Sequence, residues 1–189
     1  MSKEIYEQMH VVAYALCHFV KEAIEILAAL EAYETVLKNT DIPTPQNLFL
    51  QTAAESLRDD LIVKTAALYD KAKYGTDSNC SIDELESLIQ KDEKHDIVKK
   101  RELLRRIRTA KGLITFRLYR NKRKAHIDLD AAFEMKVPMI STDEIKNLLF
   151  ELREIISLTF EYLFSTPMNE HNYEEAKEKY IESLQKCIN

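Results

Sequence analysis

The stretch "LYRNKRKAHIDLD", residues 118–130, holds side chains that could act together on a phosphate group. Arg120 keeps its positive charge at physiological pH and presents a planar fork of donors that matches phosphate oxygens. Polar Asn121 follows it directly, and His126 is a residue type that exchanges protons near neutral pH. A cation that binds phosphate near a group that transfers protons indicates phosphate chemistry at this place.

The same stretch belongs to a strongly basic segment of an otherwise acidic chain. From Lys99 to Lys124 there are twelve lysines and arginines and one acid, Glu102, which gives this segment a net charge of +11. Because the whole chain carries −5, the remainder sums to −16. Such segregation most commonly attracts phosphate. The alternative is a solvated helix face paired with acidic neighbours in the fold. No aromatic-rich strand motif or zinc-ligand spacing accompanies the basic segment. The sequence therefore does not support a protein of the known classes that read base pairs in the grooves of double-stranded DNA.

Composition predicts the class of fold that must position these residues. The 189 residues are 46% hydrophobic and 31% charged, which fits one globular domain, and only 2 glycines and 4 prolines occur. Because a β-rich fold needs many tight turns, which glycine favours, the chain is expected to be all-α.

Hydrophobic periodicity and helix caps divide the chain into helices. Two capping boxes, Ser81 with Glu84 and Ser141 with Glu144, indicate helix starts, and Asn172 with Glu175 repeats the signature. The first expected helix is 3–38, and the second is capped by Thr44 and ends near Tyr74 with Gly75 as C-cap. A short helix around Leu85 and a basic helix from Ile97 to about His126 follow. The last two run from Ser141 to about Phe164 and over about 172–187. The prediction is a single domain over 1–189, an up-and-down helical bundle of four main helices with short additions and a core at about 5–165.

Cysteine usage and hydropathy bear on the compartment. Cys17, Cys80 and Cys187 are odd in number and far apart, which favours a reducing environment over a disulfide framework. The N-terminus shows no signal-peptide pattern, and charges interrupt the most apolar region, 11–30. We therefore expect a cytoplasmic protein without a membrane partner.

The arrangement of Arg120, Asn121 and His126 resembles the signature of the HEPN superfamily. That signature is an arginine, four to six residues of which the first is usually Asn, Asp or His, and then a histidine. The surrounding "YRNKRKAHID", with Ala125 directly before His126, is most similar to the abortive-infection AbiU branch. Upstream, "LIVKTAALYDKAKYG" and "SIDELESLIQ" resemble the middle helices of that branch, so the resemblance covers about residues 5–165.

The resemblance implies a metal-independent endoribonuclease, or a toxin-like RNA-cleaving module of prokaryotic defence. Such proteins usually dimerise so that two copies of the motif face each other across one cleft. It implies RNA as substrate, a homodimer, a possible antitoxin protein as partner, and no cofactor. The expected catalytic residues are Arg120, Asn121 and His126, and the expected RNA contacts are Arg117, Lys122, Arg123 and Lys124.

The chemistry of RNA agrees with this implication, under one geometric condition. Cleavage needs a base for the 2′-hydroxyl and a cation for the crowded phosphorane, and a dimer would supply a base and an acid as two histidines. On an ideal helix, Arg120 and His126 point about 120° apart. They converge only if the helix ends or distorts before His126, or if they act from different protomers.

Several other interpretations compete with this one. A neighbouring HEPN group carries a modifiable tyrosine two positions after the histidine, and this chain has Asp128 at that place, which argues against regulation by tyrosine modification there. Asp128 or Asp130 could instead orient His126, or could have no catalytic role. His10 and His18 recur at helical spacing with Tyr14 and Glu22, but packing is favoured over a metal site, because no HExxH pattern occurs. The alternative function is a non-catalytic helical module whose basic segment 99–124 binds nucleic acid or an acidic protein.

Overall fold

The computed structural model describes residues 3–39, 42–69, 80–93, 96–111, 141–165 and 172–188, together with the backbone of 73–74 and 77–78. Its elements in chain order are α1 (Lys3–Asn39), α2 (Thr44–Leu68), β1 (Lys73–Tyr74), β2 (Asp77–Ser78), α3 (Ile82–Lys91), α4 (Ile97–Lys111), α7 (Thr142–Phe164) and α8 (Tyr173–Ile188). The described chain is a helical bundle, which confirms the predicted all-α class.

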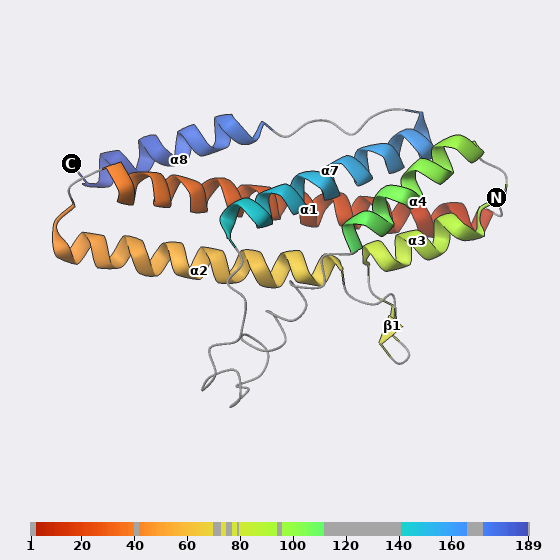
Figure 1. The fold of residues 1–189 in the computed structure, drawn as a ribbon, viewed down its shortest axis with the longest axis horizontal. Coiled ribbons are helices and arrows are strands. Elements are labelled where there is room, and N and C mark those ends of the chain that lie inside the picture. Colours follow the sequence, from red (N-terminus) through yellow and green to blue (C-terminus); the bar gives the residue numbers. More distant parts are fainter. Residues whose placement is uncertain are drawn as a thin grey trace.

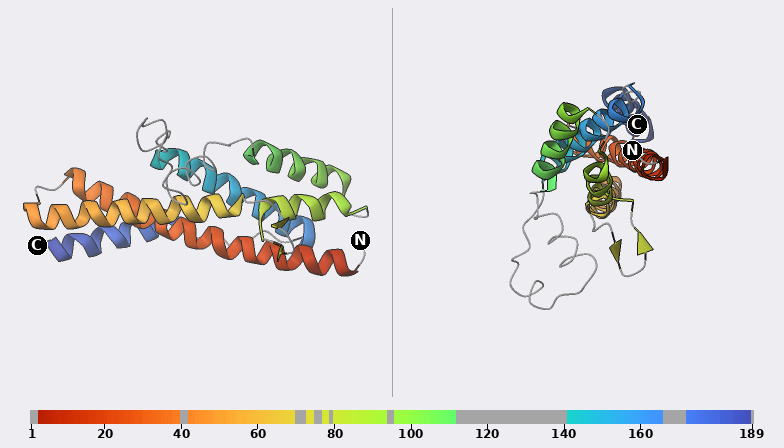
Figure 2. Two further views of the ribbon diagram at one scale, coloured as in Figure 1. Left: turned by 90° about the horizontal axis from the view of Figure 1, so that it is seen from below. Right: turned by 90° about the vertical axis from the view of Figure 1, so that its right-hand side faces the viewer.

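Helix α1 is the central element of the bundle. Its 37 residues place apolar side chains every three or four positions, among them Met9, Leu16, Leu27 and Leu30, all fully buried. Figure 1 shows α2 running back along α1, α7 crossing beside it, and α8 lying along its C-terminal half. The two further views in Figure 2 show α3 and α4 grouped toward the N-terminal end of α1. Helix α1 contacts α2, α3, α7 and α8, so its buried face holds the bundle together.

Helix α7 supplies the second large part of the core. Its buried side chains follow the same spacing: Ile145, Leu148, Leu149, Leu152, Ile155, Ile156, Thr159, Phe160, Tyr162 and Leu163. This stripe faces α1 on one side and α4 on the other. A separate small cluster of Val36, Ile42 and Leu50 packs against Leu184 and other side chains of α8, which fixes the C-terminal helix to the end of α1.

Three predicted helix ends agree with the structure. Ser141 and Glu144 form the reciprocal capping box at the start of α7. The Ser81 side chain accepts the backbone N–H of Glu84 at the start of α3, and Asn172 accepts that of Glu175 before α8. These caps were readable because cap and partner are three residues apart, so the interaction is local.

The ends of α2 correct two predictions. Thr44 is the first helical residue and Pro43 takes the cap position without a side-chain hydrogen bond, one position earlier than expected. The helix ends at Leu68 and not near Tyr74, because Lys73 and Tyr74 pair with Ser78 and Asp77 in a short antiparallel ladder. Strand pairing replaces helical hydrogen bonds here, which helical periodicity alone could not reveal. The predicted C-cap Gly75 lies outside the described residues.

None of the helices that the structure describes combines the length and the hydrophobicity that crossing a membrane requires.

Candidate functional site

The residues predicted to carry the chemistry lie outside the described part of the chain. The described residues do not include the motif itself, which is Arg120, Asn121 and His126, or the two acids after it, Asp128 and Asp130. They do not include the basic residues around the motif either: Arg117, Lys122, Arg123 and Lys124. Their roles therefore stay predictions. The motif lies within residues 112–140, which are called the motif-bearing segment below. The structure does describe the two residues on either side of this segment, which are Lys111 at the end of α4 and Ser141 before α7.

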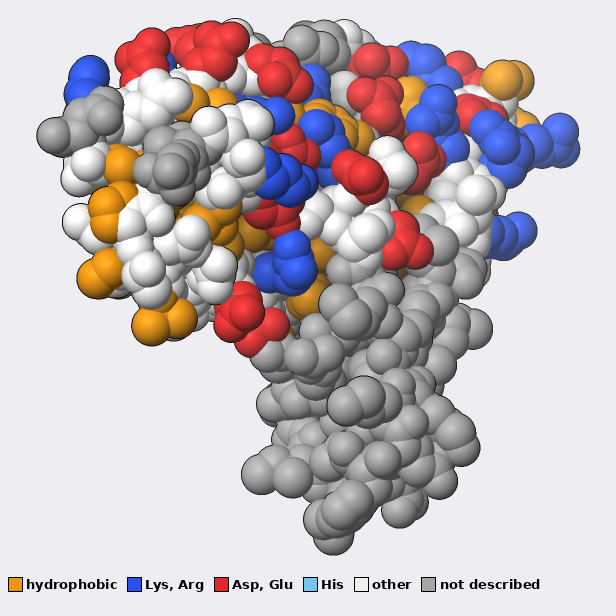
Figure 3. All heavy atoms as spheres, turned by 60° about the vertical axis from the view of Figure 1, so that its left-hand side comes forward, with side chains coloured by type: hydrophobic (Ala, Val, Ile, Leu, Met, Phe, Trp, Pro, Cys, Tyr) orange, Lys and Arg blue, Asp and Glu red, His pale blue; other side chains and the backbone are white. Residues whose placement is uncertain are grey.

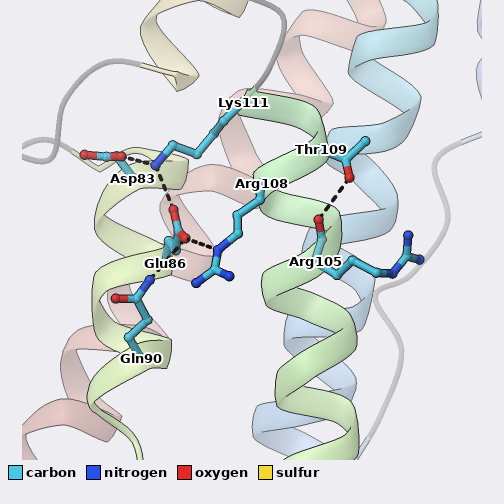
Figure 4. A network of polar contacts seen from close by, with 7 residues as sticks. All are labelled: Asp83, Glu86, Gln90, Arg105, Arg108, Thr109 and Lys111. Atoms are coloured by element: carbon cyan, nitrogen blue, oxygen red, sulfur yellow. Dashed lines mark hydrogen bonds and ion pairs between the residues drawn. The ribbon is translucent and has the colours of Figure 1, made fainter.

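The end of α4 is held to α3 by a cluster of ion pairs, shown in Figure 4. The Lys111 ammonium contacts the carboxylates of Asp83 and Glu86, the latter at 2.7 Å. Arg108 donates from Nε to the same Glu86 carboxylate at 3.1 Å. The Glu86 side chain is only 11% exposed, so water screens these pairs less than surface pairs. The cluster fixes the point at which the chain enters the motif-bearing segment.

The charge of this cluster shifts the pKa values of its members. Partial burial alone raises the pKa of Glu86, but the Lys111 and Arg108 contacts outweigh it, so the pKa lies below its ordinary value. For Lys111, burial alone lowers the pKa, but the contacts with Asp83 and Glu86 raise it by more, so the pKa lies above its ordinary value. Both groups are therefore charged at neutral pH, which keeps the cluster intact there.

A second polar cluster holds the start of α7, where the chain leaves the motif-bearing segment. The Thr142 hydroxyl donates to Glu34 Oε1 of α1 at 3.0 Å. The Arg58 guanidinium of α2 donates to the same Glu34 carboxylate and lies 3.5 Å from the Thr142 hydroxyl oxygen. One carboxylate thus joins three helices beside the capping box of Ser141.

An open pocket of about 710 Å³ lies at this junction. It is lined by residues of α1, α2 and the first turn of α7, including Glu34, Arg58 and Thr142. Glu31 also lines it and binds Lys146 of α7 at 3.0 Å and Lys177 of α8 at 2.8 Å. The charges of the pocket are therefore largely paired with one another, and its role on this evidence is to position α7.

Glu31 gives a testable dependence of stability on pH. Partial burial alone raises its pKa, but contacts with Lys177, Tyr173 and Lys146 lower it below the ordinary 4.5. Its stabilising effect is therefore present above pH 4.5 and is lost as pH falls through the lower folded pKa. We expect Glu31→Gln to lower Tm at pH 7, and the gap to wild type to narrow toward pH 3. Thermal melts across this range measure the gap, with exposed Glu154→Gln as control. A gap of constant size would contradict the assignment.

The basic segment is more extensively paired in α4 than its sequence suggests. Arg106 contacts Glu102 at 3.3 Å and Glu151 of α7 at 3.6 Å. Lys100 donates to the Gln90 carbonyl at 3.0 Å. Together with Lys111, these cations hold α4 to its neighbours, and the alternative of pairing with acidic neighbours is correct for Arg106 and Lys111.

The histidines of α1 take part in packing and in a surface pair. The His10 ring lies 4.6 Å from that of Tyr14 and 5.1 Å from that of Phe164, measured between centroids. His18 lies 3.5 Å from Glu22 on the surface. Among the described residues, no group of three or more His, Cys, Asp or Glu side chains gathers as a metal ion would need.

Sequence reasoning missed the clusters at both helix ends. Glu34, Arg58 and Thr142 are separated by 24 and 84 residues in sequence, and Asp83 and Lys111 by 28. No local spacing links them, since they meet only through helix packing. The one available signal was the density of charges on otherwise amphipathic helices.

Comparison with known proteins confirms the resemblance to the AbiU branch. No curated protein and no solved structure matches the chain. The AbiU2 family does match, over residues 4–186, and this range includes α1 through the last turns of α8 as well as the motif-bearing segment. The chain therefore belongs to the AbiU2 family of the HEPN superfamily.

Proposed function

We propose that this protein is a metal-independent endoribonuclease of prokaryotic defence or toxin–antitoxin type. One observation carries the proposal: Arg120, Asn121 and His126 match the HEPN signature within a chain that belongs to the AbiU2 family over nearly its full length. The proposed catalytic residues are Arg120, Asn121 as the polar member of the motif, and His126. Arg117, Lys122, Arg123 and Lys124 are proposed to bind RNA phosphates around them.

The proposed reaction uses the RNA 2′-hydroxyl as nucleophile. One His126 takes the hydroxyl proton while the 2′-oxygen bonds to the adjacent phosphorus, and Arg120 stabilises the charge of the phosphorane. The bond between phosphorus and the 5′-oxygen then breaks, and a second histidine gives that oxygen a proton. The products are a 2′,3′-cyclic phosphate and a 5′-hydroxyl. Every atom and proton is supplied by the RNA and the two histidines.

The described structure supports this proposal through the helices that flank the motif. Lys111 is bound to α3 and Thr142 is bound to α1 and α2, so the chain enters and leaves the motif-bearing segment at anchored points. Catalytic groups need support of this kind, because small displacements cost large factors in rate.

A homodimer is the next expectation, because each chain supplies one motif histidine and the reaction uses two. Light scattering in moderate salt should show a species of twice the 22.1 kDa chain mass. A strict monomer at micromolar concentration that still cuts RNA would contradict the shared cleft. An antitoxin protein that covers this cleft is a further proposed partner.

Incubation with tRNA and mixed RNA in EDTA tests the function itself. We expect discrete cleavage products from the purified dimer. A folded dimer that binds RNA and leaves it intact would contradict the proposal and would favour a non-catalytic module that uses the basic segment 99–124.

A further inference from the structure

Helix α4 carries more positive charge than its ion-pair partners neutralise. It contains seven lysines and arginines and one acid, Glu102. Three further carboxylates pair with it from α3 and α7, those of Asp83, Glu86 and Glu151. The seven cations therefore meet four carboxylates in ion pairs, and an excess of three positive charges is left. Two further acids lie at its N-terminal end, where Asp96 caps the helix and Asp92 accepts a hydrogen bond from the Tyr162 hydroxyl.

The cations of α4 fall into an inward and an outward group. Lys100, Arg106 and Lys111 hold α4 to its neighbours through the contacts described above. Lys99 and Arg101, by contrast, are exposed and enter no ion pair of the described residues. Two of the three cations without a carboxylate partner are therefore exposed to solvent.

Arg105 and Arg108 extend the outward group although each contacts an acid. Their side chains are 65% and 64% exposed. Arg105 donates two hydrogen bonds to Glu102, at 2.9 and 2.6 Å, and Arg108 donates to Glu86 through Nε alone. Because a guanidinium has five N–H donors, both keep donors for a second acceptor. Figure 4 shows the two side chains on opposite flanks of α4, so they border its exposed face.

The spacing of these residues suits an extended anionic chain. Arg101, Arg105 and Arg108 recur at four and then three positions, so their backbone positions lie within about 60° around the helix and span about 10 Å along it. The Arg105 and Arg108 side chains extend from there toward the two edges of this face. By contrast, the face turned toward the end of α8 and the start of α2 mixes acidic and basic side chains (Figure 3). On the exposed side of α4, basic side chains outnumber acids.

The composition of α4 indicates how such a chain would be bound. No aromatic residue occurs between Ile97 and Lys111, so the helix offers cations without a platform for stacking bases. Contacts of this kind bind phosphates and carry no base preference. The helix ends at Lys111, and Arg120 follows nine positions later in the sequence.

We propose that Arg101, Arg105 and Arg108 form a binding face for the phosphate backbone of single-stranded RNA, without regard to base sequence. This inference rests on the proposed function, because it names the surface that binds the substrate outside the catalytic motif. The face would increase affinity for RNA of any sequence and leave the chemical step to the motif residues.

Binding of an uncleavable 2′-O-methyl RNA strand tests the proposal, measured by fluorescence anisotropy at several salt concentrations. The triple variant Arg101→Gln, Arg105→Gln, Arg108→Gln should bind on the order of tenfold more weakly at moderate salt. Its slope of log affinity against log salt should fall by about 2, since each lost phosphate contact on a single strand removes roughly 0.7. Glu86 and Glu102 keep Lys111 and Arg106 as partners in this variant, so the helix should stay packed.

Two further variants make the test specific. Lys3→Gln, Lys179→Gln, Lys186→Gln removes the same charge from α1 and α8 and should bind RNA nearly as wild type does. The single variant Arg101→Gln breaks no ion pair of the described residues and should still reduce the salt slope by roughly 0.7. Unchanged binding by both α4 variants, or equal weakening by the control, would overturn the proposal.

The remaining outcomes separate this proposal from the proposed function. If 2′-hydroxyl RNA binds through α4 but is never cut, the binding face holds and the endoribonuclease proposal fails. If wild type cuts RNA and the triple variant binds as wild type does, the binding face fails alone. Tight binding of poly-glutamate without binding of RNA would assign this surface to an acidic protein partner, which overturns it as well.

Discussion

We expect His126→Ala to lose RNA cleavage by a factor of about 10² to 10⁴, because a general acid or base typically contributes this much to a rate. RNA affinity should stay nearly unchanged, since His126 acts in the proton transfers of the chemical step while the surrounding arginines and lysines bind the phosphates. Single-turnover cleavage measures the first quantity, and anisotropy with the 2′-O-methyl strand measures the second. A folded, dimeric His126→Ala protein that cleaves at the wild-type rate would show that the motif does not carry the activity.

Arg120→Ala provides the matched comparison at the same site. This variant should lose cleavage and also some affinity, because the arginine charge acts on the phosphate in both the ground state and the transition state. The double variant should be barely slower than either single one, since residues that act as a unit do not contribute additively. Losses that multiply would instead indicate two independent roles.

The second large effect concerns the bundle that positions the motif. Leu152 of α7 is fully buried in the main core, which also contains side chains of α1 and α4. Leu152→Ala should lower the free energy of unfolding by about 2 to 5 kcal/mol, through lost burial and the cavity that remains. Urea unfolding followed by circular dichroism measures this loss.

The control for this prediction lies two positions away on the same helix. Glu154 is exposed, so Glu154→Ala should change the free energy of unfolding by no more than about 0.5 kcal/mol. If Leu152→Ala were as mild as this control, α7 would not be packed as described.

Much of the bundle could be predicted because its signals are local. The long periodic stripe of α1 and the Ser141–Glu144 capping box depend on residues three or four positions apart, and both are present in the structure. The end of α2 at Leu68 could not be predicted in this way, because Tyr74 pairs with Asp77 in a ladder that overrides helical spacing.

The same distinction between local and long-range signals applies to the candidate site. Arg120, Asn121 and His126 are predicted from their spacing in the sequence, and the range matched by the AbiU2 family spans their positions. The contacts that hold the flanking helices depend on packing between distant residues. Lys111 meets Asp83 of α3, and Thr142 meets Glu34 of α1, 108 residues away in sequence. Helical patterns predict that such helices exist but not which side chains meet between them.

The chemistry of the cut ends is the most direct measurement of the proposed reaction. Wild-type protein in EDTA, given an RNA strand that it cuts at one position, should leave a 2′,3′-cyclic phosphate and a 5′-hydroxyl. The same strand with a single 2′-deoxy nucleotide on the 5′ side of that position should stay whole, because the attacking hydroxyl is missing. Cleavage of the deoxy-substituted strand, or cut ends with a 5′-phosphate and a free 3′-hydroxyl, would contradict attack by the 2′-hydroxyl.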